Sequence, residues 1–338
     1  MTARLSILVV LLVGTSASAE PATATKADKA AAKADKAAAK AATKAEKAAR
    51  LERAVADARA ALPADLVAMT NEPIMGKSDR IDGEDPHGLV AFTFDDGPNP
   101  ATSPEVIAAL EKYDIPATFF IVTQRIDGKH GEKAREVLAR ELAEGFTVGS
   151  HSVTHANLKH ADAAKLAKEV DASLRTLSPE AKRPIGLFRP PYGSMSPLGR
   201  IHLKALGLTE VFWSVDTLDW KAKDADKLRA KVHQMIIKQN GGVVLMHDIK
   251  PITAKIIASV FDDLEAENCR RIAAKQDPIT PVSLHYFLHD GGKPRAIPED
   301  VKARTATYLA KLPGRCAARP KTVAPAADPM PTEAKPIH

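Results

Sequence analysis

Two histidines and two carboxylates form the first pattern in this chain that could do chemistry. His151 and His155 stand four positions apart in the segment HSVTH, and this spacing brings two side chains onto one face of a helical turn. Asp95 and Asp96 follow the apolar run GLVAFTF, which begins at Gly88. Two histidines and one carboxylate with an open fourth position make a catalytic zinc arrangement. We therefore expect His151, His155 and Asp96 to bind Zn²⁺ or another divalent ion such as Co²⁺.

A second set of residues is suited to acid–base chemistry beside such an ion. Asp95 is a candidate general base for water, and Arg189 is suited to keep that carboxylate ionised and oriented. Amide cleavage must also protonate the departing amine. His247 is a candidate acid for that step, with Asp219 holding its other ring nitrogen. Trp220 offers a flat wall for a sugar ring or a small acyl group.

Each of these residues also has a purely structural interpretation. Paired carboxylates occur in solvated loops and helix caps, a lone histidine after an apolar run is often buried and hydrogen-bonded, and a tryptophan often packs in a core. A second pair, His285 and His289, has the same four-residue spacing within an expected strand. No acidic cluster accompanies it, so we interpret this pair as structural or surface-exposed.

The elements that must position the first set follow from hydrophobic patterning. Between residues 66 and 290, short apolar runs alternate with amphipathic segments, which is typical of β/α units around a parallel sheet. Seven such runs begin at Gly88, Ala117, Phe146, Gly186, Glu210, Gly241 and Pro281. Helical periodicity, opening on a capping type of residue, marks 103–113, 162–177 and 224–239.

These runs predict an α/β protein with a seven-stranded or incomplete barrel rather than a doubly wound sheet. An eight-stranded barrel typically needs about 250 residues, slightly more than 66–290 provides. In β/α barrels the reactive groups lie at the carboxyl ends of the strands. Asp95, Asp96, His151, Arg189 and His247 all follow or end expected strands. We therefore expect them to meet at one rim, which favours the functional interpretation.

The segments outside 66–290 have their own compositions. Residues 1–19 combine Arg4, an apolar run and small residues at Ala17 and Ala19, the pattern of a cleaved signal peptide, which predicts a secreted or periplasmic protein. Residues 20–65 are rich in alanine and lysine and should be helical or disordered, as a spacer or as an electrostatic tether to the anionic cell envelope. Residues 291–338 form a C-terminal extension with a Pro/Ala-rich tail that we expect to be disordered.

Charge and cysteine content exclude other classes. The 338 residues include 48 Lys and Arg against 42 Asp and Glu, a surplus too small for a dedicated nucleic-acid binder. No later stretch is long and apolar enough to span a membrane. Two cysteines cannot form a thiolate zinc site. In an oxidising compartment Cys269 and Cys316 should instead form a disulfide.

Five motifs stand in the order and approximate spacing of those of a known family. They are TFDDGP (93–98), HSVTH (151–155), RPPYG (189–193), DTLDW (216–220) and LMHDI (245–249). On these motifs the chain resembles the NodB-type polysaccharide deacetylases, carbohydrate esterase family 4, over about 66–290. The resemblance implies a distorted (β/α)7 barrel that removes N-acetyl groups from an acetamido sugar of a polysaccharide in a metal-dependent reaction.

The resemblance implies the same roles for the residues named above and adds two residues. The backbone N–H of Tyr192 would donate to the oxyanion, and Leu245 would wall the acetyl pocket together with Trp220. One departure is Lys250, where close relatives often have histidine. Another is the segment 268–316 with its cysteine pair, which the minimal family domain lacks.

The form DTLDW and the secretion signal are most like those of peptidoglycan N-acetylglucosamine deacetylases. Chitin, chitooligosaccharide or exopolysaccharide deacetylation is the alternative within this class. The alternative of another class is a secreted protein that binds cell-wall glycan without turnover. All of these predict a polysaccharide partner.

Overall fold

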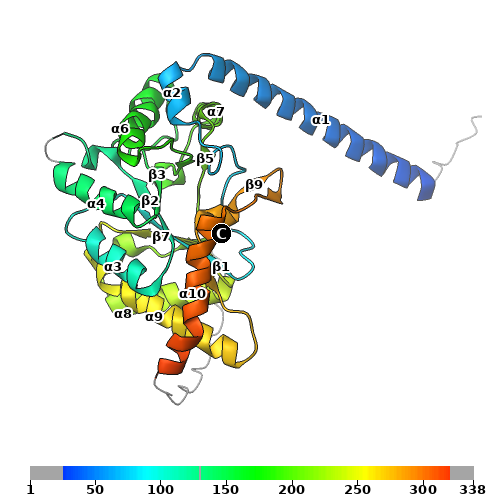
Figure 1. Cartoon of the computed structure of the whole chain (residues 1–338). Helices are drawn as coiled ribbons and strands as arrows, with labels where there is room; N and C mark the ends of the chain where they lie inside the picture. Colours follow the sequence, from blue (N-terminus) through cyan, green and yellow to red (C-terminus); the bar gives the residue numbers. More distant parts are fainter. Residues whose placement is uncertain (1–25, 129–130, 320–338) are drawn as a thin grey trace, which may run out of the picture. The chain divides into compact units, whose positions relative to one another are not determined.

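The computed structural model describes residues 26–128 and 131–319 (Figure 1). The expected signal peptide and most of the expected disordered tail lie outside the described residues. The chain divides into two compact units, one up to Arg53 and one from Ala54 onward. Within the described ranges, no helix combines the length and apolar character needed to cross a membrane.

The described part of the first unit is a single helix. α1 (Lys26–Ala60) begins there and continues into the second unit. Alanine and lysine favour the helix, and the side chains of 33–53 are exposed because they include almost no large apolar groups to bury. The part of α1 after Arg53 belongs to the second unit. There, Arg59 Nη1 donates a hydrogen bond to the Ala205 carbonyl at 2.7 Å.

A parallel sheet forms the centre of the second unit, with helices around it (Figure 1). Its strands are β1 (Leu89–Asp95), β2 (Ala117–Ile121), β3 (Thr147–Ser150), β4 (Leu187–Phe188), β5 (Thr209–Glu210), β6 (Val215–Asp216) and β7 (Gly242–His247). The order across the sheet is β5-β4-β3-β2-β1-β7-β6, and a short eighth strand, β8 (Thr280–Pro281), pairs with β1. All of these pairs are parallel, and Asp95 stands in register with His247.

The helices occupy the connections between strands. They are α2 (Ala64–Met69), α3 (Ser103–Tyr113), α4 (Glu132–Ala143), α5 (Ala163–Leu166), α6 (Ala172–Ala181), α7 (Pro197–Leu206), α8 (Ala225–Gln239), α9 (Pro251–Ala273) and α10 (Glu299–Ala318). A π-helical turn, Ala167–Asp171, joins α5 to α6, and Asp162 and Asp224 cap α5 and α8 as expected. Ser103 is not a cap, because Thr102 precedes it and its buried hydroxyl donates to Asp248 instead.

Side-chain alternation along β1 decides which residues face the barrel interior. Val90, Phe92 and Phe94 belong to the larger hydrophobic cluster, in which Phe92 packs on Phe261 of α9, whereas Ala91 belongs to a second cluster. Successive strand residues point to opposite faces, so Asp95 shares the face of Ala91. Both faces are covered, which explains why β1 reads as an almost continuous apolar run.

The fold class predicted from the sequence is confirmed: this is an α/β protein whose parallel sheet, with seven strands in order and β8 beside β1, forms a distorted and incomplete barrel. Two expected strands were wrong in detail. The run beginning at Glu210 is divided into β5 and β6, and only Pro281 of the last run is in a strand. His285 therefore lies in a 3-10 turn, Leu284–Phe287, and His289 begins a small hairpin of β9 (His289–Asp290) and β10 (Lys293–Pro294).

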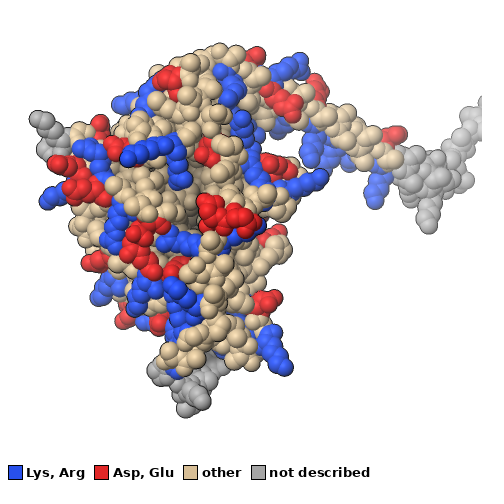
Figure 2. All heavy atoms as spheres, viewed as in Figure 1, with Lys and Arg blue, Asp and Glu red and all other residues tan. Residues whose placement is uncertain are grey.

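The C-terminal extension packs on the same unit. A disulfide joins Cys269 of α9 to Cys316 of α10, with Cα atoms 5.4 Å apart. Tyr308 of α10 is buried, and its hydroxyl accepts from Asn268 Nδ2 at 3.0 Å. Basic and acidic side chains are interspersed over this unit on the face that Figure 2 shows, so that face carries no large patch of one sign.

Candidate active site

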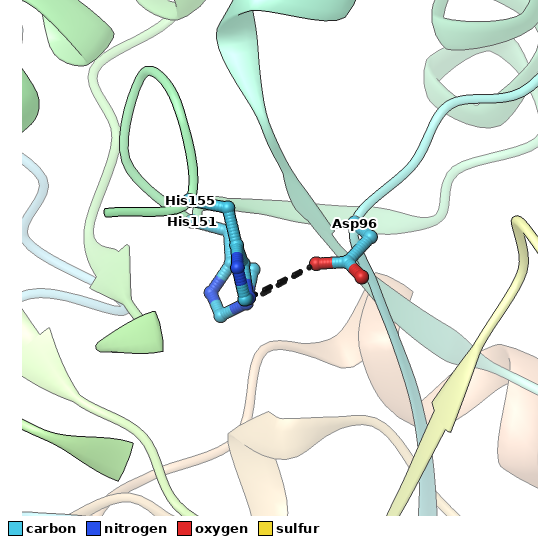
Figure 3. Close-up of side chains that lie close together, drawn as sticks. All are labelled: Asp96, His151 and His155. Atoms are coloured by element: carbon cyan, nitrogen blue, oxygen red, sulfur yellow. Dashed lines mark ion pairs between the residues drawn. The ribbon is translucent and has the colours of Figure 1, made fainter. Parts of the chain in front are cut away.

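Three side chains converge beyond the ends of β1 and β3. Asp96 Oδ1 lies 3.3 Å from His155 Nε2 and 3.6 Å from His151 Nε2, and the three ligand atoms all lie within 4.8 Å of one another (Figure 3). A tetrahedral ion with bonds of about 2.0–2.1 Å separates its ligand atoms by roughly 3.3 Å. The spacing therefore suits a single divalent ion.

Two further observations show that these groups fit a cation. The Asp96 Oδ1 atom is buried and has no hydrogen-bond partner among the described residues, a costly state that a bound cation would relieve. His151 Nδ1 is 2.7 Å from the Arg189 carbonyl oxygen, which leaves Nε2 to face Asp96. Burial lowers the pKa of His151 to about 3 against the opposing charge of Asp96, so the ring is neutral and able to act as a ligand.

The loop that carries the histidines differs from the expected helical turn. HSVTH leaves β3 as a bend, and Ser152 and His155 adopt left-handed backbone conformations with φ of 71° and 60°. Ser152 Oγ accepts from the His155 backbone N–H at 3.0 Å, which holds the loop. Asp96 is also left-handed, with φ of 73°. These backbone turns, rather than helical periodicity, bring the three side chains together.

Asp95 is held by a fully buried arginine. Arg189 Nη1 donates to Asp95 Oδ1 at 2.7 Å and to Thr93 Oγ1 at 2.8 Å, and Nη2 donates to the Phe212 carbonyl at 3.1 Å. Burial nevertheless raises the pKa of Asp95, because it outweighs the charge of Arg189. Arg189 thus orients the carboxylate, but does not hold its pKa below the ordinary value. A raised pKa strengthens Asp95 as a base.

His247 faces the cavity from β7 and is tied to Asp219. Its Nδ1 lies 2.7 Å from Asp219 Oδ1, and its backbone N–H donates to Oδ2 at 2.7 Å. Thr253 Oγ1 also donates to Oδ2, at 2.6 Å. Burial alone would lower the pKa of His247, but the hydrogen bond to Asp219 and the charges of Asp219, Asp95 and Asp96 raise it to about 9. The ring therefore carries a proton at neutral pH.

These groups share one cavity of about 390 Å³. It is lined by Asp95, Asp96, His151, His155, Pro190, Tyr192, Trp213, Asp216, Trp220, Leu245 and His247. Tyr192 and Trp220 are 64% and 54% exposed, whereas Leu245 is buried. Arg189 and Asp219 lie behind Asp95 and His247 rather than in the lining. The disulfide pair, Cys269 and Cys316, is not part of the cavity.

Three lining residues, Pro190, Trp213 and Asp216, were not among the predicted site residues, and Pro190 follows the predicted Arg189 directly. Trp213 lies in the run beginning at Glu210, which was interpreted as one continuous strand, and the break between β5 and β6 turns its ring toward the cavity. Asp216 ends β6 inside DTLDW, so its position at a strand end was the available signal. The ring of Trp213 also lies 5.7 Å from the Arg189 guanidinium.

Comparison with known proteins places the chain in a family. The family model for polysaccharide deacetylases matches residues 82–211. A chitooligosaccharide deacetylase of Sinorhizobium fredii is 33% identical over 193 residues, which are 56% of this chain and 86% of that protein. The chain belongs to the polysaccharide deacetylase family.

Two further relatives differ in how much of their own length matches this chain. Peptidoglycan-N-acetylglucosamine deacetylase PgdA of Listeria monocytogenes is 31% identical over 178 residues, 53% of this chain, and the chain spans only 36% of its length. The solved structure of the peptidoglycan deacetylase PdaC of Bacillus subtilis is 25% identical, covers 66% of this chain and 95% of that one, and has a TM-score of 0.47.

Proposed function

We propose that this protein hydrolyses N-acetyl groups from N-acetylglucosamine residues of an extracytoplasmic polysaccharide, with peptidoglycan as the substrate. One observation carries the proposal: a carboxylate base with a raised pKa and a protonated histidine line the same cavity as three converging metal-ligand groups. An amide needs both functions, because water must lose a proton and the departing nitrogen must gain one.

Each residue has a defined task in this reaction. Asp96, His151 and His155 would hold the divalent ion, which supplies Lewis acidity and a more acidic water when bound. Asp95 takes a proton from the attacking water, while Arg189 keeps its carboxylate in place.

His247 gives its proton to the amine nitrogen as the carbon–nitrogen bond breaks, so that acetate and a free amino sugar leave. Asp219 orients the ring of His247 through Nδ1. The backbone N–H of Tyr192 would donate to the developing oxyanion. Trp220 and Leu245 would enclose the acetyl methyl group.

The substrate has two candidates within this class. The relative PgdA is named for peptidoglycan N-acetylglucosamine, which supports the cell-wall polymer. The Sinorhizobium relative is named for chitooligosaccharides and matches this chain over most of its own length, which supports soluble oligomers as the second candidate.

Acetate release separates these candidates. The protein, treated with chelator and then reloaded with Zn²⁺ or Co²⁺, is assayed on purified peptidoglycan and on chitin oligomers, with Asp95→Asn as the inactive control. Faster release from peptidoglycan supports the proposal, and release from chitin oligomers alone transfers it to the second candidate. Binding to either glycan without acetate release from any substrate would identify a non-catalytic glycan-binding protein.

The proposal also gives the basic helix a role outside the cytoplasm. The exposed lysines of α1 would hold the enzyme near an anionic cell wall, an attraction that salt screens beyond about 10 Å at 0.1 M. Deletion of 27–53 spares the Arg59 contact and should lower activity on intact wall while sparing short oligomers. Equal rates on intact wall for both forms would reduce α1 to a spacer.

A further inference from the structure

The cavity that contains the candidate metal site adjoins a second cavity. This second cavity, of about 390 Å³, is lined by Val122, Gln124, Arg125 and Thr154, and it shares Asp96 and His155 with the first.

Arg125 gives the second cavity a positive charge beside the metal ligands. It ends a 3-10 turn, Thr123–Arg125, which the histidine loop holds: Thr123 N–H donates to the Ser152 carbonyl at 3.1 Å, and Gln124 N–H to the Val153 carbonyl at 3.0 Å. The side chain of Arg125 is exposed. Over the described ranges, it forms no ion pair with a carboxylate.

The opposite side of the central cavity has the opposite charge. Asp216 lines it there, at the end of β6, which is separated by β1 and β7 from β2 and the turn that carries Arg125. A glycan lying over the site with its target acetamido group at the metal would therefore meet a cation on one side and a carboxylate on the other. A negatively charged neighbouring sugar is attracted to the first side and repelled from the second.

We propose that Arg125 forms a subsite for the carboxylate of a sugar adjacent to the N-acetylglucosamine that is deacetylated. The inference rests on the proposed function and deepens it, because it names the charge of the preferred substrate and the direction in which the glycan lies. Two sources supply such a carboxylate: the lactyl group of a muramic acid that carries no stem peptide, since a stem peptide converts that carboxyl to an amide, and the carboxylate of a uronic acid. A chain of N-acetylglucosamine alone supplies none.

The test compares substrates that differ only in charge. The metal-loaded wild type and Arg125→Gln are assayed on a tetrasaccharide alternating N-acetylglucosamine and N-acetylmuramic acid, with its carboxylates free or amidated. The wild type should have the lower KM for the free acid, and Arg125→Gln should reduce that preference about two- to fivefold, the range of an exposed ion pair. High salt should reduce the wild-type preference, and Arg125→Lys should retain part of it.

Two controls make the result specific to Arg125. Arg183→Gln removes an exposed arginine from a cavity at the opposite, amino-terminal end of β3, beside Thr147, and should leave the preference unchanged. A tetrasaccharide alternating N-acetylglucosamine with glucuronic acid identifies the source. If the preference for the free acid depends on Arg125 with this oligomer as well, the subsite recognises any sugar carboxylate. If the preference depends on Arg125 only with the muramyl oligomer, the subsite recognises the lactyl group.

Equal KM values of wild type for the free acid and the amide, or an equal change in both with Arg125→Gln, would overturn the subsite. Calorimetric binding to Asp95→Asn, which does not turn over, measures the same preference independently of catalysis. If the wild type releases acetate from none of these oligomers, the proposed function fails, while the binding measurement still decides the role of Arg125.

Discussion

The two histidine pairs of this protein have the same spacing and different surroundings. His151 and His155 follow the carboxyl end of β3, where both Nε2 atoms face Asp96. His285 lies in a 3-10 turn with Nδ1 3.0 Å from Ser283 Oγ, and His289 Nδ1 lies 3.0 Å from the Phe287 carbonyl. Within the described ranges, only the first pair belongs to a group that could hold a metal ion.

The difference indicates that a third group, rather than the spacing, makes a histidine pair a candidate metal site. Both pairs contain a histidine whose pKa burial lowers, to about 3 for His151 and about 4 for His285. Neutral rings are thus present in both places. Only the first pair has a buried carboxylate oxygen without a hydrogen-bond partner aimed at its nitrogens.

The largest expected effect comes from removing one histidine from the first pair. His151→Ala deletes a ligand, so the bound ion should be lost and turnover should fall to background. His289→Ala removes a histidine from the second pair, and this variant should keep both the bound ion and normal turnover. Metal content and acetate release measured on the same preparations check this. Stoichiometric metal with normal turnover in His151→Ala would refute the ligand set.

The carboxylates beside the two pairs offer a second test. Asp95→Asn removes the base while keeping its shape, and turnover should fall roughly 100-fold or more. Metal content should stay near that of the wild type, because Asp95 is not among the expected ligands. Asp290→Asn, at an exposed carboxylate beside His289, should leave turnover unchanged. A small loss in Asp95→Asn would remove it from the role of base.

The C-terminal extension, which contributes no residue to the lining of the candidate site, should affect stability rather than chemistry. The disulfide between Cys269 and Cys316 spans 47 residues, and replacing both cysteines with alanine should lower the free energy of unfolding by up to about 4 kcal/mol. Metal binding at temperatures where the variant is folded should not change. Urea unfolding and metal titration measure the two effects. Weakened metal binding by the folded variant would show that the regions are coupled.

The smallest effect is a shift in pH dependence. The pKa of His247 is raised to about 9, so the acid holds its proton below that pH and turnover should decline above it. Asp219→Asn removes the negative charge that favours the protonated ring, so this alkaline limb should move to lower pH. His285→Asn should leave the limb in place. A pH–rate profile in which Asp219→Asn has no effect would separate Asp219 from His247.

Local patterns predicted most of the barrel, because buried parallel strands are continuous apolar runs and helices begin at capping residues. The segment 210–215 could not be divided correctly, since the break between β5 and β6 depends on how Trp213 packs against its surroundings. Ser103 resembled a helix cap, but its partner, Asp248, is 145 residues away along the chain. Contacts between distant segments leave no periodic signal.

The same reasoning applies to the candidate site. Strand ends predicted which side chains would converge, since parallel strands present their carboxyl ends at one edge. The sequence did not reveal that burial would outweigh Arg189 at Asp95, because that balance depends on how many atoms surround the carboxylate. Nor did it reveal the left-handed backbone conformations of the loop that carries His151 and His155.

Those left-handed backbone conformations place stability and catalysis in opposition, because the residues that adopt them in the site lower stability. A non-glycine residue in this conformation costs about 1–2 kcal/mol, and Asp96, His155 and Tyr192 all adopt it within the site. Glycine would relieve that cost at each position, and would delete a proposed metal ligand at Asp96 or His155. Selection for thermal resistance alone would therefore erode the site. Lys182 and Lys275 have the same backbone conformation at helix ends outside the cavity, and glycine there would strengthen the protein without touching its chemistry.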